Sequence, residues 1–173
     1  MNSMNMFNFS RRVLARGFVA WGCFAAAAQA LEVGAAAPNC QLKQLTDGQA
    51  VSLAQPGKVL YVDFWASWCG PCAQSMPFLE ALKNEFQAQG LEVVGVNVDE
   101  NKDEALAFMK KHPVSFTLAQ NEDGQCPAVF EVQAMPSSYL IDRQGKIQHI
   151  QLGFHASETG AVREKLQALL NNK

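Results

Sequence analysis

Two cysteines separated by two residues, Cys69 and Cys72, are the residues of this chain best suited to chemistry. Such a pair can close a small disulfide ring or supply half of a tetrahedral metal site. A zinc site needs a second pair of ligands, but the remaining cysteines and the 3 histidines are scattered along the chain. No His or Met cluster flanks the pair, so a copper-binding carrier is kept only as an alternative of a different class. The spacing favours dithiol–disulfide chemistry with no metal and no cofactor.

The helix expected after the pair indicates which cysteine reacts first. Apolar residues at steps of three and four predict a helix that begins within residues 68–72 and ends at Gly90: Met76, Leu79, Leu82 and Phe86. Cys69 then lies at a helix N-terminus, where unpaired N–H groups and the helix dipole stabilise a thiolate. Gly70 and Pro71 form the loop, and proline loses nothing at a helix start. We expect Cys69 to attack a substrate disulfide and the more buried Cys72 to resolve the mixed disulfide.

Asp63 is a carboxylate within an otherwise apolar run, residues 59–65, that predicts a strand buried on both faces of a parallel sheet. Burial of an ionised carboxylate is costly, so its pKa should be raised. A carboxyl group with such a pKa can act as a base near neutral pH. We expect Asp63 to accept the proton of Cys72 during turnover. The alternative is a core carboxylate that hydrogen bonds satisfy.

The elements that position these residues follow from the same patterns. Expected are a short strand pair around residues 47–48, strands over residues 91–98, 114–118, 138–141 and 146–151, a turn at residues 123–124, a helix over residues 103–111 and a last helix capped by Ser157. Leu106 and Met109 should point inward from the first of these helices, and Val162, Leu166, Leu169 and Leu170 from the last. This order predicts an α/β fold in which helices flank both faces of a central mixed β-sheet.

The chain of 173 residues suits one compact domain, and its first 30 residues differ from the rest. Three arginines and no acidic residue precede an apolar run over residues 17–28, and Ala28-Gln29-Ala30 supplies the small residues of a cleavage site. This pattern predicts a secretory signal peptide over residues 1–30, cleaved after Ala30, and an exported, periplasmic domain over residues 31–173. The apolar run is short for a membrane anchor. Arg11-Arg12 leaves a twin-arginine route open beside the general one.

Charge and cysteine content narrow the partners of the expected domain. Because three of the 14 Lys and Arg lie in residues 1–30 and none of the 16 Asp and Glu does, residues 31–173 carry a formal charge of −5. That charge argues against nucleic acid, whose phosphates require clustered positive charge. Residues 31–173 keep an even number of cysteines, which suits disulfide chemistry in an exported protein.

Residues 62–72, with the sequence VDFWASWCGPC, resemble the active-site strand and turn of thioredoxins, and residues 31–173 resemble the exported TlpA/ResA branch of that superfamily. Three further stretches resemble that branch: the opening at residues 37–39, an additional strand–helix segment over residues 91–118, and residues 130–142. The resemblance implies a thioredoxin-like fold and a thiol–disulfide oxidoreductase that acts on protein thiols or disulfides. It also implies a membrane thiol donor that returns electrons to the cysteines.

The resemblance assigns further site residues. It implies a cis bond between Met135 and Pro136, both of which then bind substrate, and a contact surface shaped by Trp68. Core packing is the alternative for Met135. The Gly-Pro between the cysteines resembles reducing thioredoxins, so a disulfide reductase is expected, with an oxidant or isomerase as the alternative. Maturation of cytochrome c or of an oxidase is a candidate role. Exported relatives often carry Asn at the position of Asp63 and an acid at that of Ser75. The loop typical of the cytochrome c maturation reductases is absent, which weakens the cytochrome c role.

Cys40 and Cys126 remain unassigned by the motif. One hypothesis is a second, structural disulfide that ties the N-terminal strand to the segment after residues 123–124, which would stabilise the fold by about 2–4 kcal/mol. The alternative is that each is a small buried apolar residue. Oligomeric state and the physiological substrate have no indicator in the sequence.

Overall fold

The computed structural model describes Met1, residues 31–121 and residues 123–172. The expected signal peptide, residues 2–30, with its cleavage point after Ala30, lies outside the described residues. Within the described ranges, no helix combines the length and the apolar character needed to cross a membrane.

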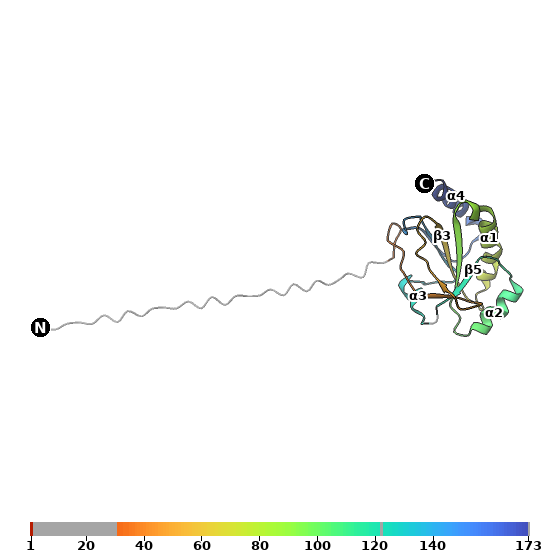
Figure 1. The fold of residues 1–173 in the computed structure, drawn as a ribbon, viewed down its shortest axis with the longest axis horizontal. Helices are drawn as coiled ribbons and strands as arrows, with labels where there is room; N and C mark the ends of the chain where they lie inside the picture. The colour runs from red at the N-terminus through yellow and green to blue at the C-terminus, as the bar shows by residue number, and fades with distance from the viewer. Residues whose placement is uncertain (2–30, 122, 173) are drawn as a thin grey trace.

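A mixed sheet forms the centre of the described domain (Figure 1). Its strands are β1 (Leu42–Gln44), β2 (Ala50–Val51), β3 (Val59–Trp65), β4 (Leu91–Asn97), β5 (Thr117–Gln120), β6 (Ser137–Ile141) and β7 (Ile147–Leu152), in the order β2-β1-β5-β4-β3-β6-β7. Strands β3, β4 and β5 run parallel, and the outer pairings are antiparallel. The first hairpin turns through Gly48 at φ 74°, a left-handed conformation that glycine adopts without cost, as the expected strand pair requires.

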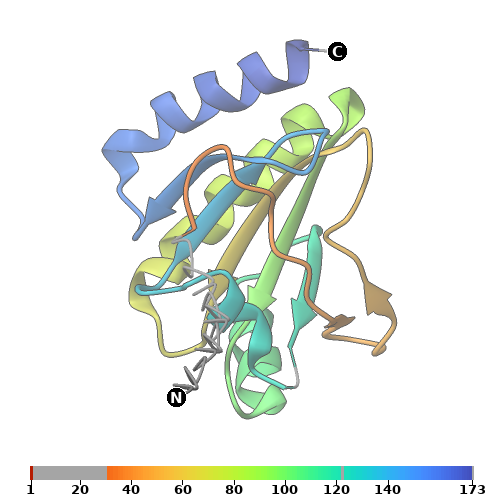
Figure 2. The same ribbon diagram turned by 90° about the vertical axis from the view of Figure 1, so that its left-hand side faces the viewer.

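Helices cover both faces of this sheet, which confirms the expected α/β architecture. They are α1 (Gly70–Phe86), α2 (Lys102–Lys111), α3 (Gln125–Val129) and α4 (Thr159–Asn171). The apolar residues of α1, α2 and α4 join one core cluster, and those of α3 join the cluster on the opposite face. Figure 2 shows α3 in front of the sheet and α1 behind it.

The apolar run of β3 is explained by these two clusters. All seven of its residues are buried, because α1 covers one face of the strand and α3 the other. On the α1 side, Trp65 stacks on Phe108 of α2 with ring centroids 5.2 Å apart. On the α3 side, Phe64 packs against Phe130 at 5.2 Å and edge-on against Tyr139 at 5.8 Å. β3 is therefore held rigidly from both faces, and so is the turn that follows it.

Two sequence expectations at element ends are wrong. The strand expected over residues 114–118 begins at Thr117, because the Ser115 N–H and hydroxyl donate instead to the Glu80 carboxylate of α1, at 2.8 and 2.5 Å. Ser157 does not cap the last helix. It lies within a 3₁₀ turn, Ala156–Glu158, and α4 starts after Glu158 without a side-chain cap.

The inward faces of the helices mostly match expectation. In α2, Leu106 and Met109 pack on the core as expected but are only half-buried, whereas Ala105 and Phe108 are buried fully or nearly so. In α4, three of the four expected residues are buried and Leu169 is half-buried. The helix α3 was not expected, because its five residues are too few to show a period.

Candidate active site

Cys69 occupies the N-cap of α1, where β3 passes through a short turn into the helix. Its Sγ accepts a hydrogen bond from the Cys72 backbone N–H at 3.1 Å, and Pro71 stands in the first turn of the helix. The structure shows the two cysteines as a disulfide with Cα atoms 5.3 Å apart. Cys72 is fully buried and Cys69 is 4% exposed. The sulfur of Cys69 thus accepts an N–H of the first turn and lies at the positive end of the helix dipole.

A surface groove of about 560 Å³ runs past the sulfur of Cys69. One wall is the turn, from Trp68 to Pro71, and the other is the segment from Val132 to Met135. Trp68 is 68% exposed, an unusual state for a large apolar side chain outside a binding surface. The groove therefore gives a partner access to the cysteine pair between an aromatic side chain and a nearby loop.

The opposite wall is fixed by the chain that leads into β6. The peptide bond between Met135 and Pro136 is cis, Pro136 is buried and Met135 is half-buried. The Ser137 hydroxyl donates to the Ala134 carbonyl at 2.7 Å, and the Gly153 N–H donates to the Pro136 carbonyl at 2.7 Å. Met135 also packs against both core clusters. It therefore lines the groove and contributes to the core at once.

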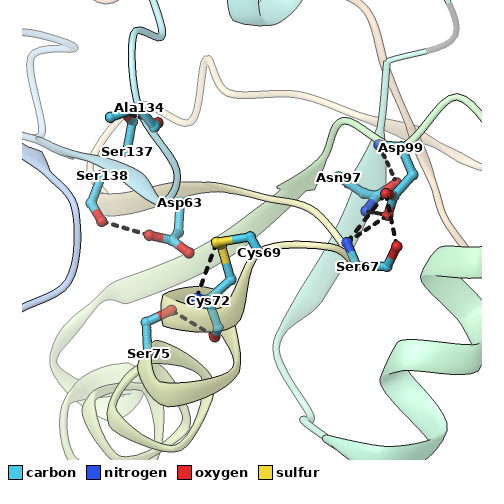
Figure 3. Close-up of a disulfide and its surroundings, with 10 residues drawn as sticks. All are labelled: Asp63, Ser67, Cys69, Cys72, Ser75, Asn97, Asp99, Ala134, Ser137 and Ser138. Atoms are coloured by element: carbon cyan, nitrogen blue, oxygen red, sulfur yellow. Dashed lines mark hydrogen bonds between the residues drawn. A yellow bond between two sulfur atoms is a disulfide. The ribbon is translucent and has the colours of Figure 1, made fainter.

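Asp63 lies on β3 with a fully buried side chain, on the same side of the sheet as the cysteines (Figure 3). The antiparallel register places Ser138 of β6 directly opposite, and its hydroxyl donates to Asp63 Oδ1 at 2.5 Å. The other carboxylate oxygen, Oδ2, has no hydrogen-bond partner. Burial raises the pKa of Asp63 to about 7, although the hydrogen bond from Ser138 works in the opposite direction. This group can exchange a proton near neutral pH.

Several polar residues that support the site carried no recognisable sequence pattern. Ser138 meets Asp63 only through the pairing of strands 75 residues apart. Ahead of Cys69, the Asp99 carboxylate accepts from the Ser67 N–H at 2.9 Å and from the Asn97 amide at 2.7 Å, which braces the turn (Figure 3). Ser75 is buried and its hydroxyl donates to the Cys72 carbonyl at 3.0 Å. The contacts of Ser138 with Asp63 and of Asp99 with Ser67 join residues 75 and 32 positions apart, so no local sequence signal links them.

The other two described cysteines, Cys40 and Cys126, lie outside the candidate active site. The structure joins Cys40 to Cys126 in a disulfide with a Cα separation of 5.3 Å. Cys126 is fully buried in the core cluster on the α3 side, whereas Cys69 and Cys72 belong to the cluster on the α1 side. Among the described residues, no group of three or more His, Cys, Asp or Glu is arranged to hold a metal ion.

The fold, together with a Cys-x-x-Cys pair at the start of α1, defines a thiol–disulfide oxidoreductase of the thioredoxin superfamily. The chain belongs to the redoxin family, whose model matches residues 32–168. It is 31% identical over 142 residues to the thiol-disulfide oxidoreductase ResA of Bacillus subtilis, which covers 82% of this chain and 79% of that protein. A ResA of Oceanobacillus iheyensis is 33% identical over 125 residues, 70% of this chain and 65% of that protein.

Solved structures agree with these relatives. A crystal structure from Chlorobium tepidum assigned as thiol:disulfide interchange protein DsbE superposes with a TM-score of 0.78 at 39% identity, covering 82% of this chain and 99% of that one. A solution structure from Bacteroides thetaiotaomicron, assigned as a protein disulfide isomerase, gives 0.73 at 26% identity over 82% and 92% of the two chains. The chain is therefore a TlpA/ResA-like oxidoreductase, and protein thiols or disulfides are its class of substrate.

Proposed function

We propose that this protein is an exported disulfide reductase in which Cys69 is the nucleophile and Cys72 the resolving thiol. The observation that carries the proposal is the position of Cys69. Its sulfur caps α1, accepts the Cys72 N–H at 3.1 Å and opens onto the groove. These contacts favour the thiolate over the thiol, so the pKa of reduced Cys69 should fall below the value of about 8.5 of a free cysteine.

The proposed reaction transfers two electrons in two exchange steps. The Cys69 thiolate attacks one sulfur of a substrate disulfide, and the other substrate sulfur leaves as a thiolate. The Cys72 thiol then loses its proton to the Asp63 carboxylate and attacks the sulfur of Cys69. The second substrate sulfur leaves as a thiolate, so the substrate is reduced to a dithiol and the protein oxidised to its disulfide.

The groove supports the assignment of the binding residues. Trp68 and Met135 line opposite walls, and Pro136 follows directly at the start of β6. We assign Trp68, Met135 and Pro136 to the binding of an extended substrate segment beside Cys69. Gly70 and Pro71 complete the exposed turn beside Cys69 and border the groove.

The decisive experiment is the capture of partners. Cys72→Ser should accumulate mixed disulfides on Cys69, because the resolving thiol is gone while the nucleophile is intact. Cys69→Ser is the matched control and should capture nothing. Stable complexes formed by Cys69→Ser alone would reverse the two roles.

The direction of electron flow is open to measurement by redox equilibrium with glutathione. A reductase is expected to have a potential near −270 mV, as in thioredoxin, whereas a value near −120 mV would show the oxidant instead. Native mass spectrometry with and without copper distinguishes either redox function, reductase or oxidant, from that of a copper carrier. Retention of copper without disulfide turnover would overturn the proposed reaction.

Export and electron supply complete the proposal. The basic, apolar and small-x-small pattern of residues 1–30 supports removal of a signal peptide after Ala30 and a periplasmic location. A reductase there needs a membrane thiol donor to reduce the Cys69–Cys72 disulfide. Candidate substrates are the cysteines of apocytochrome c, the copper-site cysteines of an oxidase and damaged secreted proteins. Partners captured by Cys72→Ser from the periplasm identify donor and substrate together.

A further inference from the structure

The backbone nitrogen of Leu31 lies 3.0 Å from Oε2 of Glu131. Leu31 is the residue that removal of the proposed signal peptide would make the first of the mature chain. In the unprocessed chain this nitrogen belongs to a neutral amide with one hydrogen to donate. In the processed chain it is an α-amino group, which is protonated below a pKa of about 8.

The position of this nitrogen is fixed by contacts that lie after it in the chain. The Gly34 N–H donates to the Ile147 carbonyl at 2.7 Å, and the Ala37 N–H donates to the Gly145 carbonyl at 2.8 Å. The Leu31 side chain itself packs against the core cluster on the α3 side. These contacts all join residues 31–37 to other described residues of the domain, so they remain after processing and hold the nitrogen beside Glu131.

Glu131 has an unusual backbone conformation and lies directly before the groove wall. At φ 52° it is the single non-glycine residue with a positive φ in the described part of the chain. Such a conformation is unfavourable for a side chain with a Cβ and persists where surrounding contacts hold it. Glu131 joins α3 to Val132, the first residue of the segment that forms the second wall of the groove.

We propose that hydrolysis of the Ala30–Leu31 peptide bond by signal peptidase creates an ion pair between the new α-ammonium group and the Glu131 carboxylate, and that this pair positions the Val132–Met135 wall of the groove. The cleavage consumes one water molecule and leaves a carboxylate on Ala30. Glu131 is then a positioning residue for substrate binding, remote from the chemistry at Cys69. This inference rests on the proposed signal peptide and not on the direction of electron transfer.

The test uses the full chain, exported by a bacterial host and purified from the periplasm. Glu131→Gln removes the carboxylate charge, and insertion of two glycines between Ala30 and Leu31 moves the amino group away. Glu32→Gln is the matched control, because Glu32 is a neighbouring exposed carboxylate whose side chain does not contact the groove. The substrate is insulin, whose disulfides the protein reduces, and dithiothreitol supplies electrons to the protein.

Glu131→Gln and the insertion should each raise KM about threefold, the size expected of an exposed ion pair, and together they should do no more than either alone. The kcat and the rate of Cys69 alkylation by iodoacetamide should stay unchanged, which a general loss of structure would not allow. In an NMR titration, the α-amino pKa of Leu31 should lie above that of an unpaired terminus and return to it in Glu131→Gln.

Equal KM values for Glu131→Gln and Glu32→Gln, or an unperturbed α-amino titration in the unmodified protein, would overturn the ion pair. Intact mass of the purified protein reports the processing separately. A mature chain that starts at a residue other than Leu31 would overturn the inference, because it requires cleavage after Ala30. Insulin reduction by the same sample would still test the proposed activity.

Discussion

The two disulfides of the domain join cysteines at the same Cα separation, 5.3 Å, yet they differ in almost everything else. Cys69 and Cys72 are three residues apart, and Cys40 and Cys126 are 86 residues apart. Closing a long loop removes more conformational freedom from the unfolded chain than closing a short one. The long bridge should therefore stabilise the fold by about 4–5 kcal/mol and the short one by about 2 kcal/mol.

Their surroundings differ in the same sense. Cys69 caps a helix and borders a groove, so its thiolate is favoured electrostatically and reachable by a partner. Cys126 is enclosed among apolar residues such as Phe130, which disfavour a thiolate, while its partner Cys40 is half-buried. These surroundings suit the Cys69–Cys72 bond to the proposed redox chemistry and the Cys40–Cys126 bond to a structural role.

The largest expected effect comes from Cys69→Ser. Insulin reduction should fall by at least about 10³-fold, because the attacking thiolate is lost and a hydroxyl cannot replace it at neutral pH. The free energy of urea unfolding of the oxidised protein should fall by only about 2 kcal/mol, since the loop that this disulfide closes is short. Residual activity within tenfold of the unmodified protein would show that another thiol attacks the substrate.

The double variant Cys40→Ser, Cys126→Ser should have the opposite balance of effects, with a loss of stability and little loss of activity. Loss of the long bridge is expected to lower the free energy of unfolding by about 2–5 kcal/mol, measured by urea denaturation of the oxidised proteins. The rate of insulin reduction at 25 °C should remain within about twofold. A loss of activity as large as that of Cys69→Ser would place the second pair in the redox cycle and remove the distinction between the bridges.

The surroundings of Cys69 and Cys72 also show which structural features could be predicted from the sequence and which could not. The Cys-x-x-Cys spacing, the buried run around Asp63 and the helix after Cys69 are local patterns, and each predicted its structure. The register that sets Ser138 against Asp63 depends on strand pairing over 75 residues, which no local pattern encodes. The strand expected over residues 114–118 starts later, at Thr117, because another long-range contact intervenes: Glu80 of α1 accepts the hydrogen bonds of Ser115.

Asp63→Asn tests the active-site side of the comparison. An amide cannot accept the proton of Cys72, so insulin reduction at pH 7 should slow by roughly 10²-fold, the lower end of the range for general bases. Alkylation of Cys69 by iodoacetamide should be much less affected. Equal rates for the two proteins across pH 6–8 would remove Asp63 from the reaction.

The same variant has a consequence for stability. Because the pKa of Asp63 in the fold is about 7, above its ordinary value, the folded protein binds more protons than the unfolded chain between about pH 4 and pH 7. Stability must then fall as pH rises through this range. Asp63→Asn should abolish that dependence and be the more stable protein at pH 8, as urea unfolding of the oxidised forms would measure. A stability difference independent of pH would contradict the raised pKa.

The smallest effect is expected from Ser138→Ala. The lost hydroxyl donates to Asp63 Oδ1, and this bond favours the carboxylate, so its removal should raise the pKa of Asp63 further. Less of the base is then ionised at pH 7, and the rising limb of the pH–rate profile should move to higher pH, with insulin reduction at pH 7 about two- to fivefold slower. The double variant Ser138→Ala, Asp63→Asn should be no slower than Asp63→Asn alone, because the serine acts through the carboxylate. An additional loss in the double variant would mean that Ser138 supports the site by a route other than Asp63.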